Sequence, residues 1–489
     1  MKVVIVGGGT AAWMAAAALA KTFPHYNITL IKGGDPIGVG ESTTPHINQY
    51  LKYMGIDDKT FLLAARATYK SSSRFENFTE LDHVFHYPNG QSQAIGLTDA
   101  TFHDWMCAKA YGLQPPPFAD VFMPFVTVAE EKKMPINNSL LFPYDLSKDR
   151  SFHIDGSKFS AYLQETFCSN VRVVDSEVKS VSYKAGRIQF ITVERGETDL
   201  RNPQVDADLY LDCTGQKSTL GGAMTRWIDF PSIPTDTAVI RKREYKDKDK
   251  EMVPYTNAKG MSAGWMWTIP TWDYISEGYV FSSKYRSPEG AMHESGLHNG
   301  KVIKFRNGKQ KEAWVGNCVM IGLSYSFIEP LESTSLFSAH HGILALCDSL
   351  REEPGINKFM KDRFNHNMNE HVEGWKEFVE AHYYYSRRTD TEFWEEATQR
   401  THYEPKGAHD LVRFHMVGGD PVQHEAQPIL YILGGAGYTT VRKRSYQYFD
   451  YPSVSSKKVD EWVHLYERRK KLAESLPTMY KYLKENFYS

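Results

Sequence analysis

The chain has few cysteines, and their spacing indicates neither a metal site nor a disulfide framework. Its 489 residues include five scattered cysteines with no CxxC spacing: Cys107, Cys168, Cys213, Cys318 and Cys347. Zinc sites and disulfide-rich folds both need patterned cysteines, so no metal is expected. Scattered thiols fit a reducing compartment, and we expect a cytoplasmic location.

Long apolar runs are also lacking. The apolar start MKVVIVGGG is interrupted at once by glycines, and no cleavage-like site follows it. We therefore expect no signal peptide. No apolar run is long enough to span a bilayer, so no membrane association is expected either.

Neither sign of charge is in excess. The 57 basic and 59 acidic residues give a net charge of −2, and no long run carries one sign. A nucleic-acid or membrane-surface partner is therefore not indicated.

Aromatic residues make up 13% of the chain, which suits a flat apolar ligand and a plain core equally well. The length favours two or more domains or one large domain with insertions, and a homo-oligomer is an open option.

The first segment, KVVIVGGGTAAWMAAAALAKTF, has the pattern of a buried strand, a tight glycine turn and an alanine-rich helix. Gly7, Gly9 and Ala12 fill a GxGxxA spacing, in which the glycines permit the turn and a close approach of backbone N–H groups to a pyrophosphate. The start of the helix then faces the phosphates with its positive dipole end. This context predicts dinucleotide binding by Gly7, Gly9, Thr10, Ala11 and Ala12.

Two further features bear on the cofactor. The second strand, NITLIKGGD, ends in Lys32 where an acid usually binds the ribose hydroxyls, so Asp35 or backbone groups are expected to substitute. A second glycine-rich turn, GVGEST, follows it. We expect Gly40, Glu41 and Ser42 to pack against the cofactor, because glycine permits close approach. The alternative is an ordinary surface turn.

Two later stretches, ADLYLDCTGQKS (207–218) and WVGNCVMIGLSYSFIEPLESTS (314–335), resemble segments of FAD-dependent monooxygenases with the para-hydroxybenzoate-hydroxylase-like fold. The resemblance implies an α/β fold whose Rossmann-like FAD module is assembled from distant pieces, with a β-rich substrate layer inserted between them. It also implies that Asp212 and Gly322 bind the cofactor. The alternating stretches SEVKSVSYK and GRIQFITVERGE suit strands of the inserted layer.

We expect two domains. Residues 1–350 would form the discontinuous FAD-binding domain with its β-rich insert. Residues 351–489, which contain aromatic clusters and helically spaced apolar residues, would form a mainly helical substrate-side region.

The stretch GWMWTIP (264–270) narrows the resemblance. It matches the WxWxIP fingerprint of flavin-dependent halogenases, the group that includes tryptophan halogenases. GGGTAAW, GVGEST, ATYKSSSRF and FIEPLESTS also resemble segments of that family, in the same order along the chain. Several independent motifs in one order are far more specific than any single one.

Membership of this family would imply a reaction in which reduced FAD, O2 and halide give hypohalous acid, which then halogenates an electron-rich aromatic or indole-like substrate. A separate flavin reductase is implied, because no second dinucleotide motif is found. The resemblance places the catalytic lysine at Lys70, either as a hydrogen-bond donor to hypohalous acid or as a haloamine. The alternative reading is that Lys70 ends an exposed helix face.

By the same resemblance, Glu332 orients the oxidant or takes the ring proton, with Glu329 as the competing acid. The alternative is a carboxylate that stabilises a helix start. The backbone N–H groups of Thr334 and Ser335 resemble the family's halide site. Well-known members have glycine at the position of Ser335, so chloride, bromide and iodide all stay open.

Trp265 and Trp267 alternate by two, so both face one side of a strand. With Pro270, the resemblance makes them a wall between flavin and substrate that passes only the small oxidant. Two core tryptophans on a buried strand face are the plain alternative, and the two readings are compatible.

A hydroxylating flavin monooxygenase and a non-catalytic flavin-binding protein remain as competing functions. The sequence does not identify the substrate or say whether a carrier protein holds it.

Overall fold

The computed structural model describes residues 1–34, 40–90, 99–110, 112–136, 144–194, 203–352, 355–399, 426–437 and 456–488. The chain forms two compact units, each built from three segments. The first unit contains residues 1–67, 154–236 and 303–376. The second contains residues 68–153, 237–302 and 377–489, so both units include chain from before and after residue 350.

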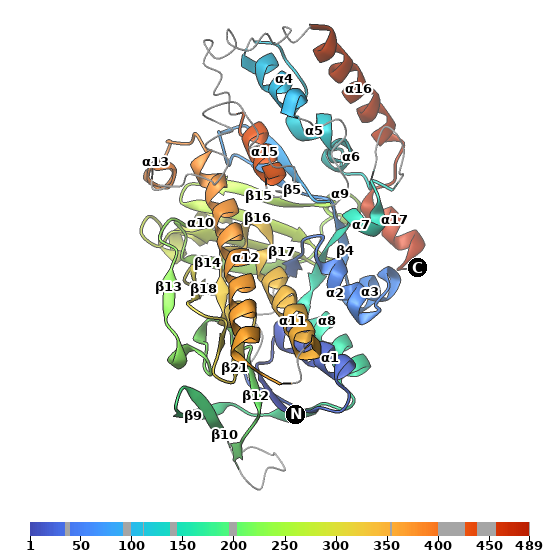
Figure 1. Cartoon of the computed structure of the whole chain (residues 1–489). Helices are drawn as coiled ribbons and strands as arrows, with labels where there is room; N and C mark the ends of the chain where they lie inside the picture. The colour runs from blue at the N-terminus through green and yellow to red at the C-terminus, as the bar shows by residue number, and fades with distance from the viewer. Residues whose placement is uncertain are drawn as a thin grey trace. The chain divides into compact units, whose positions relative to one another are not determined.

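A six-stranded sheet forms the centre of the first unit (Figure 1). Its order is β20-β21-β12-β1-β2-β8, and all neighbours are parallel except β20 with β21. The five parallel strands thus follow the doubly wound order 3-2-1-4-5, with the switch point between β1 and β12. The strands are β1 (Lys2–Val6), β2 (Asn27–Lys32), β8 (Arg172–Asp175), β12 (Leu209–Asp212), β20 (Trp314–Val315) and β21 (Cys318–Met320).

Helices pack closely beside this sheet. α1 (Thr10–Thr22) contacts both α8 (Gly156–Phe167) and α11 (Thr334–Glu352), as Figure 1 shows. Ala15, Ala16, Ala17 and Ala18 of α1 are fully buried, and these small side chains let the neighbouring helices approach. The other helices of this unit are α2 (Ile47–Met54), α3 (Asp58–Ala64) and the first part of α12 (Lys358–Tyr384).

Smaller sheets complete the first unit. β9 (Val178–Lys184), β10 (Arg187–Val193) and β11 (Gln204–Val205) form one of them, and β13 (Trp227–Asp229), β19 (Gly308–Gln310) and β22 (Ser326–Phe327) form another. The two alternating stretches are therefore strands, as predicted, and they lie within the first unit. A tight turn at Ala185 and Gly186, both with positive φ, pairs β9 and β10 with each other. Ile188, Ile191 and Val193 of β10 pack into one apolar cluster with residues of β1, β2 and β12.

The second unit contains a seven-stranded sheet. Its order is β18-β14-β17-β16-β15-β5-β6, in which β15 and β5 run parallel. β17 lies near the middle and is buried along its whole length. The strands are β5 (Ser72–Glu76), β6 (Val84–Pro88), β14 (Thr237–Arg243), β15 (Tyr255–Met261), β16 (Gly264–Pro270), β17 (Ile275–Phe281) and β18 (Lys301–Lys304).

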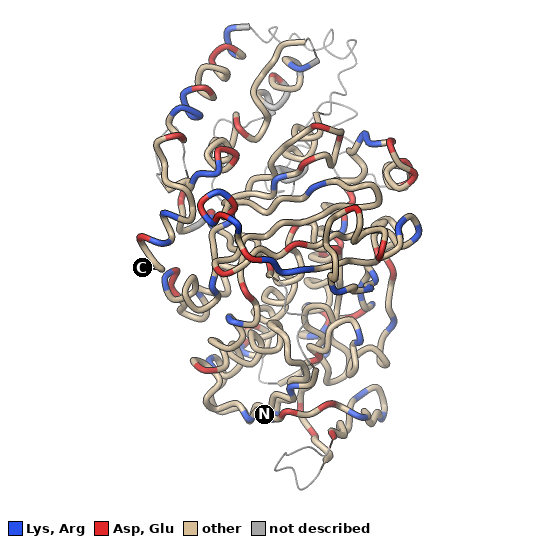
Figure 2. Tube along the Cα trace, turned by 180° about the vertical axis from the view of Figure 1, so that it is seen from behind, with Lys and Arg blue, Asp and Glu red and all other residues tan. Residues whose placement is uncertain are grey.

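The described chain beyond residue 350 is helical, as predicted. It contains α12, α13 (Glu392–Gln399), α15 (Ala426–Gly435), α16 (Ser456–Glu474) and α17 (Met479–Asn486). The second unit also has α4 (Asp99–Ala110), α5 (Phe118–Phe122), α6 (Phe125–Glu130), α7 (Leu146–Asp149), α9 (Lys248–Glu251) and α10 (Pro288–Ser295). Among the described residues, no helix combines the length and apolar character that crossing a membrane requires. Acidic and basic residues are interspersed along the trace (Figure 2).

Candidate active site

The glycine turn lies at the switch point of the parallel sheet. Gly7 follows β1 with φ +143°, and a Cβ atom on it would come 2.3 Å from the carbonyl oxygen of Cys213, which follows β12. The Gly7 N–H donates to the Ile31 carbonyl at 3.0 Å, and the Cys213 N–H donates to the Val6 carbonyl at 2.8 Å. Only glycine fits this close approach of two chain segments, which confirms the turn geometry that the sequence predicts.

The start of α1 has the features of a phosphate site. Gly9 caps the helix with extended backbone, no side chain caps it in the described structure, and its first turn carries no acidic residue. No atom of a neighbouring segment lies within 4 Å of a Cβ placed on Gly9, whereas Ala12 is fully buried. Exposed N–H groups at a helix start bind phosphate, so this geometry fits the pyrophosphate of a dinucleotide.

Glu41 lies in β3 (Gly40–Ser42) and accepts a hydrogen bond from Thr10 Oγ1 at 3.1 Å. A Cβ on Gly156, at the start of α8, would come 2.0 Å from Glu41 Oε1. Desolvation raises the pKa of Glu41 to about 7, against the lowering effect of Thr10 and with a further rise from Asp155. The second glycine-rich turn is therefore tied to the first by a carboxyl group that titrates near neutral pH.

Asp212 is fully buried and organises the segment after β12. Its Oδ1 accepts hydrogen bonds from Thr214 N at 3.0 Å, Thr214 Oγ1 at 2.7 Å and Ser324 Oγ at 3.1 Å. Its Oδ2 accepts from Leu220 N at 2.7 Å and Gly221 N at 2.9 Å. Both oxygens thus hold protein groups in place, and a direct role toward a cofactor stays a prediction.

Gly322 lies on the same side as the first turn. Its φ is +63°, and a Cβ on it would lie 3.4 Å from the Cβ atoms of Ala11 and Ala339. The turn after β21 is thereby brought against the start of α1, which supports its assignment to the cofactor module. Asp35 lies outside the described residues.

The start of α11 carries the predicted acid and halide residues. Glu332, which is 2% exposed, ends a short 3₁₀ turn (Pro330–Glu332), and Ser333 follows with φ +60° before α11 begins at Thr334. Thr334 is buried and Ser335 is partly exposed. The 19-residue helix directs its first N–H groups toward this turn, a geometry that suits an anion.

The competing acid, Glu329, has structural partners. It is fully buried, its carboxylate accepts a hydrogen bond from Thr235 Oγ1, and its N–H donates to Asn307 Oδ1 at 2.8 Å. Glu329 therefore fixes the turn that precedes α11, and the choice between Glu329 and Glu332 for the chemical role stays a prediction.

Lys70 belongs to the second unit, where it ends β4 (Thr68–Lys70). The strand pairs with β7 (Ser151–Asp155), and Ser151 Oγ donates to the Lys70 carbonyl at 2.8 Å. Lys70 is only 1% exposed. The alternative that it ends an exposed helix face is therefore wrong. Lysine is almost never buried to this extent without a partner or a function.

Next to Lys70 lies a hydrogen-bond network that sequence reasoning missed. Thr68 Oγ1 donates to the Pro270 carbonyl at 2.5 Å and lies 3.3 Å from His153 Nδ1. His153 Nε2 lies 2.9 Å from Thr256 Oγ1. Burial, and secondarily the charge of Lys70, hold the pKa of His153 well below its usual range, so the imidazole is neutral. A lone histidine carries no local sequence signal for such a network.

Trp265 and Trp267 lie on β16 as predicted, with ring centroids 6.1 Å apart. They are 1% and 7% exposed, and Trp267 Nε1 donates to Ser276 Oγ at 3.3 Å. Both indoles therefore belong to the core of the second unit. A role as a wall beside the flavin stays compatible with this burial and stays a prediction.

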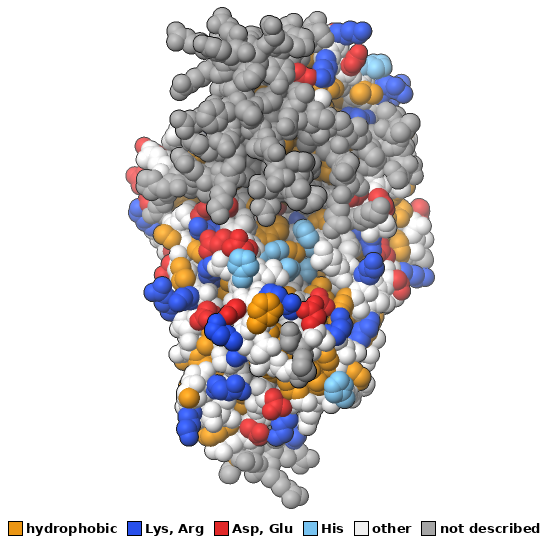
Figure 3. All heavy atoms as spheres, viewed as in Figure 1, with side chains coloured by type: hydrophobic (Ala, Val, Ile, Leu, Met, Phe, Trp, Pro, Cys, Tyr) orange, Lys and Arg blue, Asp and Glu red, His pale blue; other side chains and the backbone are white. Residues whose placement is uncertain are grey.

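Four histidines of the first unit gather around Phe337 of α11: His46, His340, His341 and His371. Figure 3 shows histidine side chains, in pale blue, on the face over the middle of α12. The rings of His341 and His371 stack at 3.9 Å, and desolvation, with the two neighbours His341 and His46, lowers the pKa of His371 to about 3. Burial also lowers the pKa of the other three histidines, so these imidazoles pack as neutral aromatic rings. Among the described residues, no group of three His, Cys, Asp or Glu side chains could hold a metal ion.

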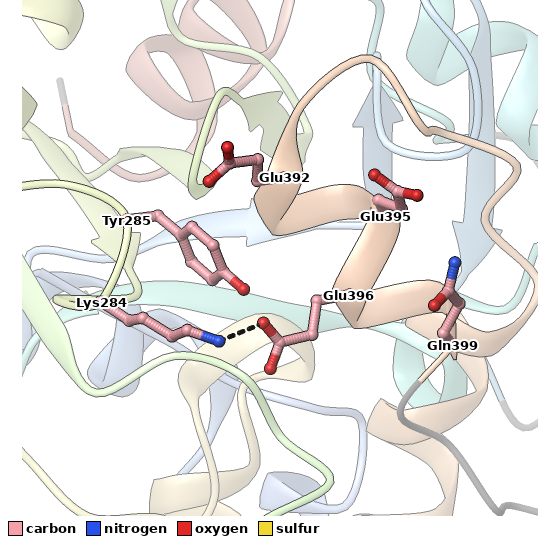
Figure 4. Close-up of a pocket in the computed structure, with 6 residues that line it drawn as sticks. All are labelled: Lys284, Tyr285, Glu392, Glu395, Glu396 and Gln399. Atoms are coloured by element: carbon pink, nitrogen blue, oxygen red, sulfur yellow. Dashed lines mark hydrogen bonds and ion pairs between the residues drawn. The ribbon is translucent and has the colours of Figure 1, made fainter.

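A shallow hollow of about 280 Å³ lies on the second unit (Figure 4). Lys284, Tyr285, Glu392, Glu395, Glu396 and Gln399 line it. Lys284 pairs with Glu396, and the remaining groups are two carboxylates, a phenol and an amide. None of the predicted site residues lines this hollow, so it is separate from the candidate active site.

The amino-acid sequence is similar to known enzymes over most of its length. Residues 2–436 match the family model described as tryptophan halogenase. KtzR, a 7-chloro-L-tryptophan 6-halogenase from Kutzneria sp. (strain 744), is 28% identical over 98% of this chain and 98% of its own. RebH, a tryptophan 7-halogenase from Lentzea aerocolonigenes, is 29% identical over 80% of this chain and 78% of its own.

Solved structures give the same result. The apo structure of VirX1 superposes with a TM-score of 0.88 at 30% identity and covers 100% of this chain and 99% of its own. BrvH, a flavin-dependent halogenase from Brevundimonas sp. BAL3, has a TM-score of 0.82 at 26% identity, with 99% of each chain covered. The similarity therefore extends over the residues of both units.

Proposed function

Because the chain belongs to the tryptophan halogenase family of flavin-dependent enzymes, we propose that it is an FADH2-dependent halogenase acting on an electron-rich aromatic or indole-like substrate. Hypohalous acid formed at the flavin would be the halogenating species. The observation that carries the proposal is the burial of Lys70, which is 1% exposed on a short strand within the segment that resembles the family's catalytic one. Lysine side chains are rarely buried to this extent, and a catalytic role would account for the position of this one.

The first unit would hold the FAD. Gly7 permits the close approach of the turn to the segment after β12, and Gly9 leaves space beside the start of α1, where N–H groups would meet the pyrophosphate. The remaining cofactor residues are proposed to be Thr10, Ala11, Ala12, Asp35, Gly40, Glu41, Ser42, Asp212 and Gly322. When bound in its reduced form, FAD would supply two electrons to O2, so that one oxygen atom ends as water and the other oxidises the halide to hypohalous acid.

Lys70 would hold and activate hypohalous acid. Its ammonium donates a hydrogen bond to the oxygen of HOX, which makes that oxygen a better leaving group. The aromatic ring attacks the halogen, so that the carbon–halogen bond forms while the halogen–oxygen bond breaks. The departing hydroxide takes a proton from the Lys70 ammonium and leaves as water, and exchange with solvent later returns that proton to Lys70. The ring proton then passes to Glu332, which restores aromaticity. The overall change is ArH + HOX → ArX + H2O.

The start of α11 would bind the halide through the N–H groups of Thr334 and Ser335. The positive end of a long helix favours an anion there. Trp265, Trp267 and Pro270 are proposed to separate flavin from substrate, so that only the small oxidant passes. A separate flavin reductase and a cytoplasmic location complete the proposal, and a homo-oligomer stays an open option.

The decisive assay combines the protein with a flavin reductase, NADH, FAD, each halide in turn and a panel of aromatic substrates, followed by mass spectrometry. Lys70→Met should lose at least about a hundredfold in product, within the range of general acid–base effects. Lys284→Met is a matched control, because the Lys284 side chain is 59% exposed and pairs with Glu396 on the surface.

Three outcomes would contradict the proposal. Oxygenated product without halide would indicate a hydroxylase. Bound FAD with no turnover of any substrate would indicate a flavin-binding protein. Full activity of Lys70→Met in a folded sample would remove Lys70 from the mechanism even if the halogenase function were correct.

A further inference from the structure

We propose that His153, Thr68 and Thr256 form a buried hydrogen-bonded bridge that positions the strand of Lys70 against the end of β16, and that this positioning directs the oxidant to the substrate. The three are positioning residues, since they would act through Lys70. The inference rests on the proposed function for the role of Lys70, but the bridge itself is a property of the second unit.

The hydrogen bonds of the bridge have only one consistent direction. The Thr68 hydroxyl donates to the Pro270 carbonyl at 2.5 Å, so its oxygen accepts from His153 Nδ1–H at 3.3 Å. Nε2 of this neutral imidazole then has a lone pair and accepts from the Thr256 hydroxyl at 2.9 Å. The network thus links β4, β7, β15 and the last residue of β16.

One member of the bridge, Thr68, lies on the same strand as Lys70. Thr68 and Lys70 are two residues apart on β4 and therefore face the same side of it. In the ladder, Thr68 pairs with His153 and Lys70 with Ser151. A change in the Thr68 contact would shift the strand that presents the Lys70 side chain.

The opposite face of β4 is held separately. The Tyr69 ring lies 5.5 Å from that of Phe152 and 6.4 Å from the rings of Tyr482 and Phe487, near the C-terminus. These aromatic contacts stabilise the strand without fixing its register against β16. The hydroxyl of Thr68 provides such a link, because it joins the strand of Lys70 to the Pro270 carbonyl at the end of β16.

An uncharged bridge avoids electrostatic repulsion with the nearby Lys70 ammonium group. His153 is fully buried, and its interaction with Lys70 is repulsive when both are charged. An imidazole that bonds two hydroxyls in its uncharged form fixes the geometry without adding a second positive charge beside the ammonium group. A carboxylate or a lysine in the same place would alter the charge of the site.

Thr68→Val and Thr68→Ser test the bridge as a matched pair. Valine has nearly the shape of threonine but lacks the hydroxyl, whereas serine keeps it. The readouts are halogenated product per FADH2 oxidised and free hypohalous acid trapped by a chlorinatable dye. Thr68→Val should lower product per FADH2 about fivefold, the equivalent of one hydrogen bond, with free hypohalous acid rising correspondingly. Thr68→Ser should stay within about twofold of the wild type.

His153→Asn and His153→Leu form a second pair of similar size. Asparagine can still donate to Thr68, so it should keep more of the product yield than leucine. Unchanged product per FADH2 in Thr68→Val would overturn the inference. A fall of halogenated product and of free hypohalous acid in the same proportion would also overturn the inference, because general unfolding lowers both together.

Hydrogen–deuterium exchange provides a readout that is independent of activity. Thr68→Val should speed amide exchange in the peptides that contain residues 68–73 and 268–275, whereas Thr68→Ser should not. If the wild type forms no halogenated product, the proposed function fails, yet exchange still decides whether the bridge exists. Equal exchange in both variants would contradict the bridge.

Discussion

The indole of Trp267 on β16 lies against Gly278 on β17, and a Cβ atom added to Gly278 would come 2.2 Å from the Trp267 ring. The two residues are register partners in the antiparallel ladder. Glycine at this position thus makes room for one of the two tryptophans of the motif. The motif therefore depends on a residue eleven positions beyond Trp267, in a strand with no motif of its own.

Gly278→Ala should lower the free energy of unfolding by about 1–3 kcal/mol, because overpacking a core forces side chains from their preferred positions. Trp267→Phe removes the ring atoms that the new methyl group would meet. The double variant should therefore be more stable than the sum of the two single effects predicts. Denaturant unfolding of the four proteins measures this coupling, and strict additivity would contradict the contact.

Replacing Trp265 and Trp267 together by leucine should open the proposed wall. The expected products are a fraction of hydroxylated substrate beside the halogenated one, since oxygen transfer requires direct access to the flavin. The variant is also expected to lose roughly 3–5 kcal/mol or more of stability, because two buried indoles are removed. Mass spectrometry on protein shown to be folded by circular dichroism provides the test. A folded variant with an unchanged product would leave the wall without support.

Glu332→Gln should reduce halogenation about a hundredfold, as expected for loss of a group that takes a proton. Glu329→Gln keeps an acceptor for the Thr235 hydroxyl and should stay within about threefold of the wild type. The rate constants of both variants under saturating substrate measure the difference. The reverse pattern would assign the proton transfer to Glu329.

Ser335→Gly should raise the chlorinated fraction when equimolar chloride and bromide compete. Removing the side chain lets the smaller halide approach the N–H groups at the start of α11 more closely, and an anion gains most from short contacts. Ser338→Gly on the same helix controls for the helix-weakening effect of glycine. An equal shift in both variants would show that the halide does not contact Ser335.

Glu41→Gln should change the pH dependence of stability. The pKa of Glu41 is raised to about 7 in the folded protein, so its stabilising contribution is present below the ordinary value of 4.5 and is lost as the pH rises to about 7. A glutamine is uncharged at every pH. In acid, the free energy of unfolding of the variant should therefore equal that of the wild type. Above pH 7 it should be higher than that of the wild type by up to about 3 kcal/mol. This value is an upper limit, because the side chain is partly exposed.

Denaturant unfolding of the FAD-free protein across this pH range measures the effect. Gln49→Glu, on the exposed part of α2, introduces a carboxylate that titrates normally and provides a control. A constant difference between Glu41→Gln and the wild type would show that Glu41 titrates at its ordinary pKa.

The amino-acid sequence by itself determined the parts that depend on local geometry. The GxGxxA spacing predicted the turn at Gly7, because glycine spacing between a strand and a helix has few structural outcomes. The alternation of Trp265 and Trp267 predicted a strand with both indoles on one side. The order of several short motifs then indicated the family, which the match over residues 2–436 confirms.

Only the tertiary structure decided which polar residues are buried and what they bind. Thr68 and Pro270 are 202 residues apart, and Asp212 and Ser324 are 112 apart, yet each pair is joined by a hydrogen bond. Such partners are set by the packing of whole sheets, and no local pattern encodes them. For the same reason the sequence left Lys70 open between an exposed helix face and a buried site, a choice that its position on β4 resolves.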